Sequence, residues 1–121
     1  MSSLKTERLI LQVLRDTSKG DVNWQVGDPP ESLIRGTDNY IPLYLEAKYK
    51  GKDIAVYEVR YKYYRDEDDW SWSADVKFIM LSGDVVVLET DSYSPALSQL
   101  FTAARSDAAG LDDLLDDLLD N

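Results

Sequence analysis

Hydrophobic residues recur at helical spacing near the start of the chain. From Leu4 to Lys19 the apolar side chains fall near intervals of three and four residues, which predicts an amphipathic helix with one apolar stripe. Either Ser2 or Ser3 is suited to cap its first turn, and Gly20 supplies the left-handed conformation at which helices commonly end. The first predicted element is therefore a helix that buries one face.

Polar and apolar residues alternate in the next segment, 21–26, and this alternation predicts a half-buried strand. Residues 27–39 carry two prolines and Gly36 but few apolar side chains, so we expect a long loop there. The inner face of the strand carries Val22, Trp24 and Val26.

Four further segments alternate in the same way and predict an antiparallel meander. With the strand over 21–26 they make five strands in all. The expected fold class is α+β, with a five-stranded, mainly antiparallel sheet flanked by an N-terminal helix and one or two C-terminal helices. The four segments are Tyr40 to Tyr49, Asp53 to Arg65, Trp70 to Leu81 and Asp84 to Thr90.

The register of these strands is predicted by placing the most apolar face of each strand on one side of the sheet, because a slip of one residue turns a whole face over. In this arrangement the three tryptophans belong to the buried face and pack in the core. The predicted turns are a three- or five-residue turn around Gly51, a turn centred on Asp66-Glu67 with Tyr63 opposite Trp70 and Tyr61 opposite Trp72, and a two-residue turn at Ser82-Gly83 with Met80 opposite Val85.

The opposite face of the predicted sheet divides into a charged half and an apolar half. In the charged half Glu46, Glu58 and Asp75 are interleaved with lysines and arginines, which indicates cross-strand ion pairs. The apolar half is less polar than a solvated sheet face should be and forms a candidate contact surface. Its residues include Ile79, Leu81, Val86 and Leu88.

Two helical patterns follow the sheet. Ser94-Pro95 predicts a helix start, with the serine as cap and the proline at the first helical position. Gly110 then separates this helix from the acidic amphipathic segment 111–121, so the expected organisation is one domain over residues 1–110 followed by a C-terminal helix. Along that helix leucines recur at intervals of three and four on one face, at Leu111, Leu114, Leu115, Leu118 and Leu119.

The C-terminal segment is too short to form a stable helix in water without a surface to cover its leucines. It either folds back onto the sheet, over the apolar half of the second face, or docks in trans on a partner or a second copy of the chain. The sequence leaves both alternatives open. The candidate partner-binding residues are the five leucines, the flanking Asp112 and Asp116, and the four apolar sheet residues Ile79, Leu81, Val86 and Leu88.

Composition narrows the class of function. The net charge is −10, and six of the 23 acidic residues but none of the 13 basic ones follow Arg105. This acidity argues against a nucleic-acid partner, whose phosphates require a basic patch, and favours a protein with a basic surface. No apolar run is long enough to span a membrane, and no secretory signal is recognisable, so the cytoplasm is the expected location and no membrane partner is expected.

The sequence also lacks most residues on which catalysis depends. It contains no cysteine and no histidine, which removes thiolates, disulfides and the commonest general base and metal ligand. The run from Asp66 to Asp69 has oxygen ligands but not the spacing or the glycine of a calcium loop. No phosphate loop or nucleophile motif occurs. We therefore expect no enzyme activity, no cofactor and no metal.

The order of features resembles that of small uncharacterised bacterial α+β domains. The resemblance rests on a leucine-rich first helix ending in Thr17-x-x-Gly20, the tryptophan-bearing Gly20-Asp-Val-Asn-Trp24, a tyrosine-rich meander and a closing LxxLFxxAR helix with an Asp/Leu tail. It implies the fold and a bacterial cytoplasm, and it implies no activity because these are packing motifs.

These observations predict a non-enzymatic protein–protein interaction module, an adaptor or regulatory partner, that can form a homodimer. The alternative is an acidic inhibitor or decoy, of the phage anti-defence or immunity type, that blocks the basic site of an effector.

Overall fold

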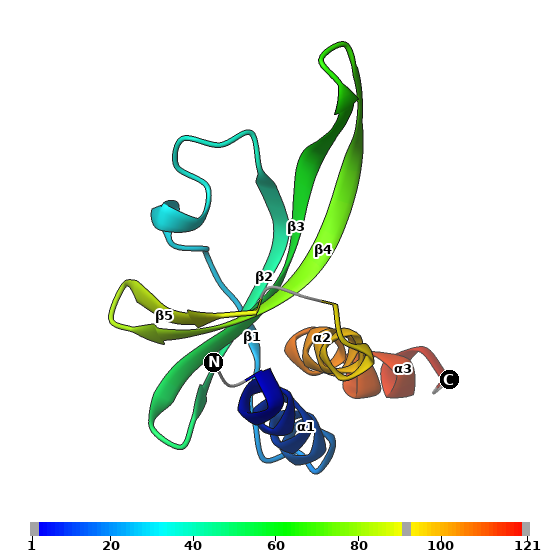
Figure 1. The fold of residues 1–121 in the computed structure, drawn as a ribbon. Coiled ribbons are helices and arrows are strands. Elements are labelled where there is room, and N and C mark those ends of the chain that lie inside the picture. Colours follow the sequence, from blue (N-terminus) through cyan, green and yellow to red (C-terminus); the bar gives the residue numbers. More distant parts are fainter. Residues whose placement is uncertain (1–2, 91–92, 120–121) are drawn as a thin grey trace.

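A computed structural model of the chain describes residues 3–90 and 93–119. In these residues one open sheet of five strands carries α-helices against one face and a short 3-10 helix against the other (Figure 1). The elements in chain order are α1 (Ser3–Ser18), β1 (Gln25–Val26), the 3-10 helix (Glu31–Leu33), β2 (Tyr40–Tyr49), β3 (Lys52–Asp66), β4 (Asp69–Ser82), β5 (Val85–Glu89), α2 (Pro95–Ala108) and α3 (Leu111–Leu119).

The sheet is a meander with the strand order β1-β2-β3-β4-β5, and every neighbouring pair is antiparallel. The expected α+β class is confirmed. The observed strands lie within two residues of the predicted bounds for β2, β3, β4 and β5. Strand alternation was therefore enough to locate the meander along the chain.

The first helix is confirmed. It ends where Gly20 takes a left-handed conformation with φ 81°. The predicted cap at Ser2 lies outside the described residues, and Ser3 belongs to the helix itself. One face of α1 is fully buried through Ile10 and Val13, as the apolar stripe predicts.

The strand predicted over 21–26 is largely wrong, because only Gln25–Val26 pairs with β2. Val22 and Trp24 are buried, but Val26 is exposed. The backbone N–H of Trp24 donates to Oδ2 of Asp107 in α2, so this residue is held by a helix and not by a neighbouring strand. Residues 21–24 enter the core without extending the sheet, which only Gln25–Val26 joins.

The register between β2 and β3 differs from the prediction. A two-residue turn at Lys50-Gly51 joins them, with both residues at positive φ (51° and 80°), which is typical of tight hairpins. Tyr49 pairs with Lys52 and Leu45 with Val56, so the predicted three- or five-residue turn is wrong. The prediction assumed that one face of each strand is buried and the other is exposed, but the centre of β3 is buried on both faces.

The two later registers are also wrong, by one residue in the second hairpin and by two to three residues in the third, where Met80 pairs with Leu88 and not with Val85. In the second hairpin Tyr64 pairs with Trp70, and an irregularity follows between Tyr64 and Asp66. In the third hairpin the turn is at Gly83-Asp84, so that Ser82 pairs with Val85. A strand irregularity shifts which residues pair across two strands. The alternation of polar and apolar residues along the sequence does not show where such a shift occurs.

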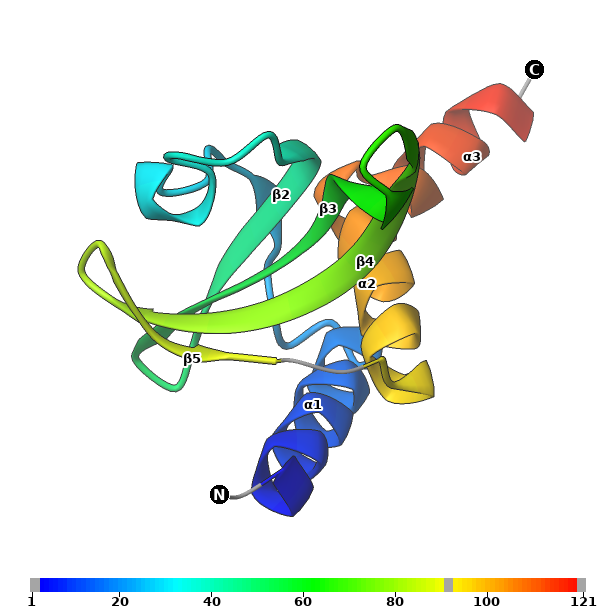
Figure 2. The same cartoon turned by 45° about the horizontal axis from the view of Figure 1, so that its top comes forward.

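Helices α1 and α2 pack side by side against one face of the sheet and enclose the larger hydrophobic core (Figure 2). Ser94 caps α2, as predicted, and accepts a hydrogen bond from the Leu97 backbone N–H at 3.2 Å. The Ser94 hydroxyl also donates to Glu7 Oε2 at 2.8 Å, which joins the starts of the two helices. The predicted apolar stripe of α2 is buried at Leu97, Leu100, Phe101 and Ala104.

The other face of the sheet carries a second, smaller core. Tyr44 and Tyr57 lie in it with their ring centroids 5.8 Å apart, and Leu33 of the 3-10 helix packs against it. The loop predicted over 27–39 thus contributes a short helix that helps to cover this face. Both faces of the sheet centre are therefore covered.

Candidate functional site

Helix α3 carries the leucine face that the sequence singled out. It begins after Gly110, whose φ of 61° allows the chain to break from α2. The helix extends beyond the end of α2, away from the sheet (Figures 1 and 2). No residue of α3 is buried, and between 40% and 80% of the surface is exposed in each of Leu111, Leu114, Leu115, Leu118 and Leu119.

Helix α3 receives little cover from the rest of the described chain. A helix of nine residues is marginal in water. Asp112 and Asp113 are well placed in its first turn, whereas Asp116 and Asp117 lie toward the negative end of the helix dipole, where acids are unfavourable. Among the described elements it packs mainly on α2. Its apolar face therefore remains open to another surface.

The four apolar sheet residues of the predicted contact surface do not form one open patch. Ile79 is fully buried, and Leu81 and Val86 pack against the smaller core around it. Leu88 packs against the larger core on the helix-bearing face. Because α3 also lies away from these residues, the structure does not adopt the fold-back onto them.

A second exposed surface was missed by the sequence analysis. The outer halves of β3 and β4 extend beyond the helices as a two-stranded arm (Figure 1). On it Trp70 and Trp72 are 41% and 54% exposed, so the prediction that they pack in the core is wrong. Tyr64 lies beside Trp70, with 6.4 Å between ring centroids. We call Tyr64, Trp70, Trp72 and Lys62 the aromatic arm.

Aromatic and cationic contacts order the side chains of the aromatic arm. The Trp70 and Trp72 rings meet edge to face with centroids 5.7 Å apart. The Lys62 ammonium lies 4.8 Å from the Trp70 centroid and 5.9 Å from that of Trp72. Such cation–π contacts contribute about 0.5–1 kcal/mol at exposed sites. The length of the two strands, well beyond what two helices cover, was the available signal for this surface.

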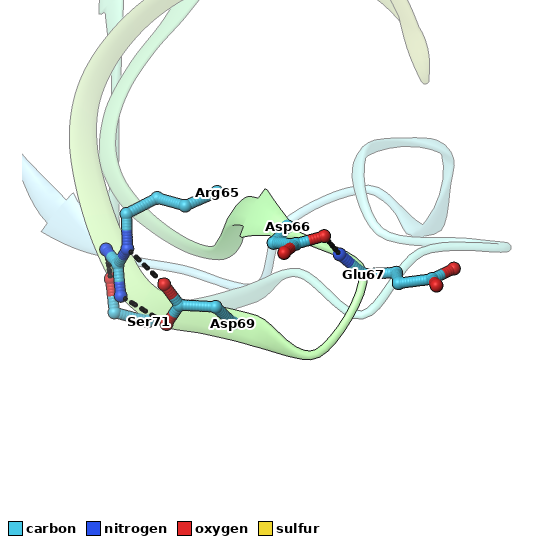
Figure 3. A network of polar contacts seen from close by, with 5 residues as sticks. All are labelled: Arg65, Asp66, Glu67, Asp69 and Ser71. Atoms are coloured by element: carbon cyan, nitrogen blue, oxygen red, sulfur yellow. Dashed lines mark hydrogen bonds and ion pairs between the residues drawn. The ribbon is translucent and has the colours of Figure 1, made fainter.

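The acidic tip of the arm is occupied by local bonds (Figure 3). The Arg65 guanidinium donates to both carboxylate oxygens of Asp69, at 3.0 and 3.1 Å, and to the Ser71 hydroxyl at 3.0 Å. Asp66 Oδ1 accepts the Glu67 backbone N–H at 2.8 Å. Within the described residues no group of three acidic side chains is placed to hold a metal ion. The tip serves the turn and its solubility.

The three carboxylates of the predicted charged half, Glu46, Glu58 and Asp75, do not converge on one point. Glu58 pairs with Val76 across the sheet and points to the helix-bearing face, whereas the pairings of Glu46 and Asp75 place them on the other face. The prediction that they share a face is therefore wrong. Glu58 accepts a hydrogen bond from Arg60 Nε at 3.4 Å. Glu58 and Asp75 both line the cavity between β4 and α2 but point to opposite faces of the sheet, and Glu46 lines a different cavity.

Two cavities flank the sheet. One of about 350 Å³ lies between β4 and α2, with Glu58, Lys77 and Arg105 in its wall. The other, of about 570 Å³ on the opposite face, is lined by Tyr44 among several carboxylates. Burial, with the nearby charges of Glu46 and Asp53, raises the pKa of Tyr44 to about 12. The phenol is therefore protonated at neutral pH and is no base for catalysis there.

Burial also raises the pKa of Tyr57, whose hydroxyl donates to Glu89 Oε2 at 3.0 Å. The pKa of Tyr49 rises for the same reason, helped by the hydrogen bond that its hydroxyl donates to Asp16. Tyr57 thereby joins β3 to β5, and Tyr49 joins β2 to α1.

None of the helices in the described part of the chain has the length and apolar composition needed to cross a membrane. Comparison of the chain with protein-family models, with curated proteins and with solved structures found no match. Its function is therefore inferred from its own residues, and the leucine face of α3 is the strongest candidate site.

Proposed function

We propose that this protein is a non-enzymatic protein–protein interaction module, an adaptor or regulatory partner, that docks through the leucine face of α3. The observation that carries the proposal is the exposure of all five leucines on a helix that projects from the body of the protein. Amphipathic helices recognised in grooves use anchors at this spacing.

The energy available from this face is sufficient for specific binding. Full burial of a leucine side chain contributes about 1.5–3 kcal/mol, and Leu118 and Leu119 are almost fully available for burial. Association and ordering of the helix together cost at least several kcal/mol. The exposed surface of the five leucines equals about three whole side chains, or about 4–9 kcal/mol before that cost, which leaves enough for weak, reversible docking with a dissociation constant toward the millimolar range.

The charge of α3 defines the kind of partner. Four aspartates flank the leucines, and no basic residue lies in the helix. A groove with an apolar floor and a basic rim fits this pattern, and complementary charge would speed the encounter and reject acidic surfaces. The aromatic arm offers a second contact region, because tryptophan and tyrosine are enriched in binding hot spots. The cellular setting we propose is the bacterial cytoplasm.

Site-specific photocrosslinking in the native cells tests the proposal. A photoreactive residue replaces Leu114 or Leu118 on the leucine face, and matched variants carry it at Asp113 or Asp117 on the opposite face. We expect discrete protein adducts from the leucine positions and much weaker ones from the aspartate positions. Equal labelling from both faces, or no adduct from either, would contradict docking through α3.

The second candidate function, an acidic inhibitor of a basic effector, draws on the same helix. It is favoured by the aspartates of α3, which form no ion pair within the described residues. An inhibitor that acts by charge should lose affinity steeply between low and high salt, because the Debye length falls from about 30 Å at 0.01 M to about 3 Å at 1 M. Binding dominated by leucine burial should change little.

A further inference from the structure

Helix α1 presents a basic face with exposed leucines. Leu4 and Leu11 are exposed, although the opposite side of the same helix is buried in the core. A shallow, open depression of about 520 Å³, which we call the α1 groove, lies on this face and is lined by residues of α1 alone: Lys5, Arg8, Leu9, Leu11, Gln12 and Arg15. In a chain with a net charge of −10, a surface with three basic and no acidic side chains is unusual.

The basic side chains of this groove are largely unused within the chain. Arg15 lies 3.8 Å from Asp16, a long contact. Among the described residues, Lys5 and Arg8 take part in no ion pair. The α1 groove therefore places three basic side chains beside the exposed Leu11, while Leu9 packs partly against the core, and its charge complements that of α3.

We propose that the leucine face of α3 docks in the α1 groove of a second copy of this chain. This inference rests on the proposed function and names the partner. The leucines of α3 would meet the exposed Leu4 and Leu11, while its aspartates would lie beside Lys5, Arg8 and Arg15. Exposed ion pairs contribute little energy individually, so leucine burial supplies the affinity and the charges set partner and register.

The dimensions and symmetry of the two helices support this pairing. At 1.5 Å per residue, the nine residues of α3 span about 14 Å and the sixteen residues of α1 about 24 Å, so one α3 fits along one groove. Because each chain carries one groove and one projecting helix, two copies can exchange α3 reciprocally. A two-fold exchange closes on itself as a dimer and leaves neither apolar face open.

Sedimentation velocity of the intact chain over a concentration series tests the proposal. We expect a reversible shift from the 13.8 kDa monomer to twice that mass as the concentration rises toward about 1 mM. Charge reversal of the groove in R8E/R15E, or of the helix in D112R/D116R, should each weaken association at least about tenfold, because each places like charges in contact.

Mixing the two reversed variants gives the decisive result. In the mixed pair an acidic groove meets a basic helix on one side, and the unaltered acidic helix meets a basic groove on the other. Association should therefore recover to near that of the unaltered chain, which a loss of folding in either variant cannot produce. The double reversal R35E/K52E, at exposed basic residues outside α1, is the matched control and should associate normally.

The outcomes separate this inference from the proposed function. If the intact chain remains monomeric throughout the series, docking on a second copy is overturned, while crosslinking from the leucine face to another protein still tests docking through α3. If L118D weakens association but R8E/R15E does not, α3 docks on a second copy but not in the α1 groove, and the groove assignment is overturned. Failure of the mixed pair to recover association would also overturn it.

Discussion

The backbone N–H of Trp24 donates a 2.8 Å hydrogen bond to Oδ2 of Asp107, a residue 83 positions later in the chain. The bond ties the segment after α1 to the last turn of α2. It holds the point from which α3 departs, so the orientation of the leucine face depends on it. The indole N–H of the same tryptophan donates to Thr17 Oγ1 at 3.1 Å, so hydrogen bonds hold both the backbone and the side chain of Trp24.

Replacement of Asp107 tests this link. D107A removes the acceptor and should lower the free energy of unfolding by about 1 kcal/mol, the net contribution of one hydrogen bond. The charge of the acceptor strengthens this bond, but an acid near a helix C-terminus is unfavourable, and the two effects offset each other. D107N keeps an acceptor oxygen and should cost less than about 0.5 kcal/mol. Urea unfolding of both variants measures the difference, and equal losses would contradict the assigned role of this acceptor.

The three tryptophans should report different environments. Trp24 is 3% exposed, whereas Trp70 and Trp72 lie on the aromatic arm. In W70F/W72F the remaining fluorescence should be blue-shifted and weakly quenched by acrylamide, and in W24F it should be red-shifted and strongly quenched. W24A should cost about 3–5 kcal/mol and W72A less than about 1 kcal/mol, because only the first leaves a cavity in a core. Similar quenching in both fluorescence variants would count against an exposed arm.

The tryptophans also show that the sequence pattern predicts the strands but not which of their side chains are exposed. Alternation located the strands of the meander, and the start of α2 followed from Ser94 and Pro95, because both signals are local. The exposure of Trp70, in contrast, depends on residues far from it in the sequence. It depends on a register set by the Lys50-Gly51 turn and by a strand irregularity, and on how far two helices reach along β4.

The leucine face of α3 could be predicted because the spacing of its leucines is visible within nine consecutive residues. The groove on α1 could not. Leu11 belongs by type to the core, and only the packing of α1 against α2 determines that it faces solvent while Ile10 and Val13 do not. Likewise Ile79 was expected on an open surface, but a 3-10 helix in the preceding loop helps to cover that face.

Alkaline pH should destabilise the fold through its buried phenols. The pKa of Tyr44 is raised from 10.0 to about 12, so the folded state holds this proton more tightly than the unfolded chain does. The resulting stability is complete below pH 10 and is lost as the pH rises through 12, by roughly 2 kcal/mol for this residue. Urea midpoints between pH 9 and 12 should fall less steeply in Y44F. An identical slope would show that Tyr44 does not carry the effect.

The leucines of α3 should matter for association and not for folding. L118A and L119A should change the free energy of unfolding of the dilute monomer by less than about 0.5 kcal/mol, because both side chains are exposed. L100A, in the fully buried stripe of α2, is the matched control and should cost about 2–5 kcal/mol. Thermal or urea unfolding at low concentration measures both. A large loss in L118A would mean that this leucine has a place in the chain's own core.

The most direct measurement of docking in trans is hydrogen exchange of the backbone amides of α3. At about 1 µM the purified chain is a monomer, and these amides should exchange rapidly, because a nine-residue helix without cover opens readily. At about 500 µM they should become protected, together with the side of α1 that carries Arg8, and R8E/R15E should abolish that protection. Full protection of α3 already in the dilute monomer would contradict the account, since the leucines would then be covered by their own chain.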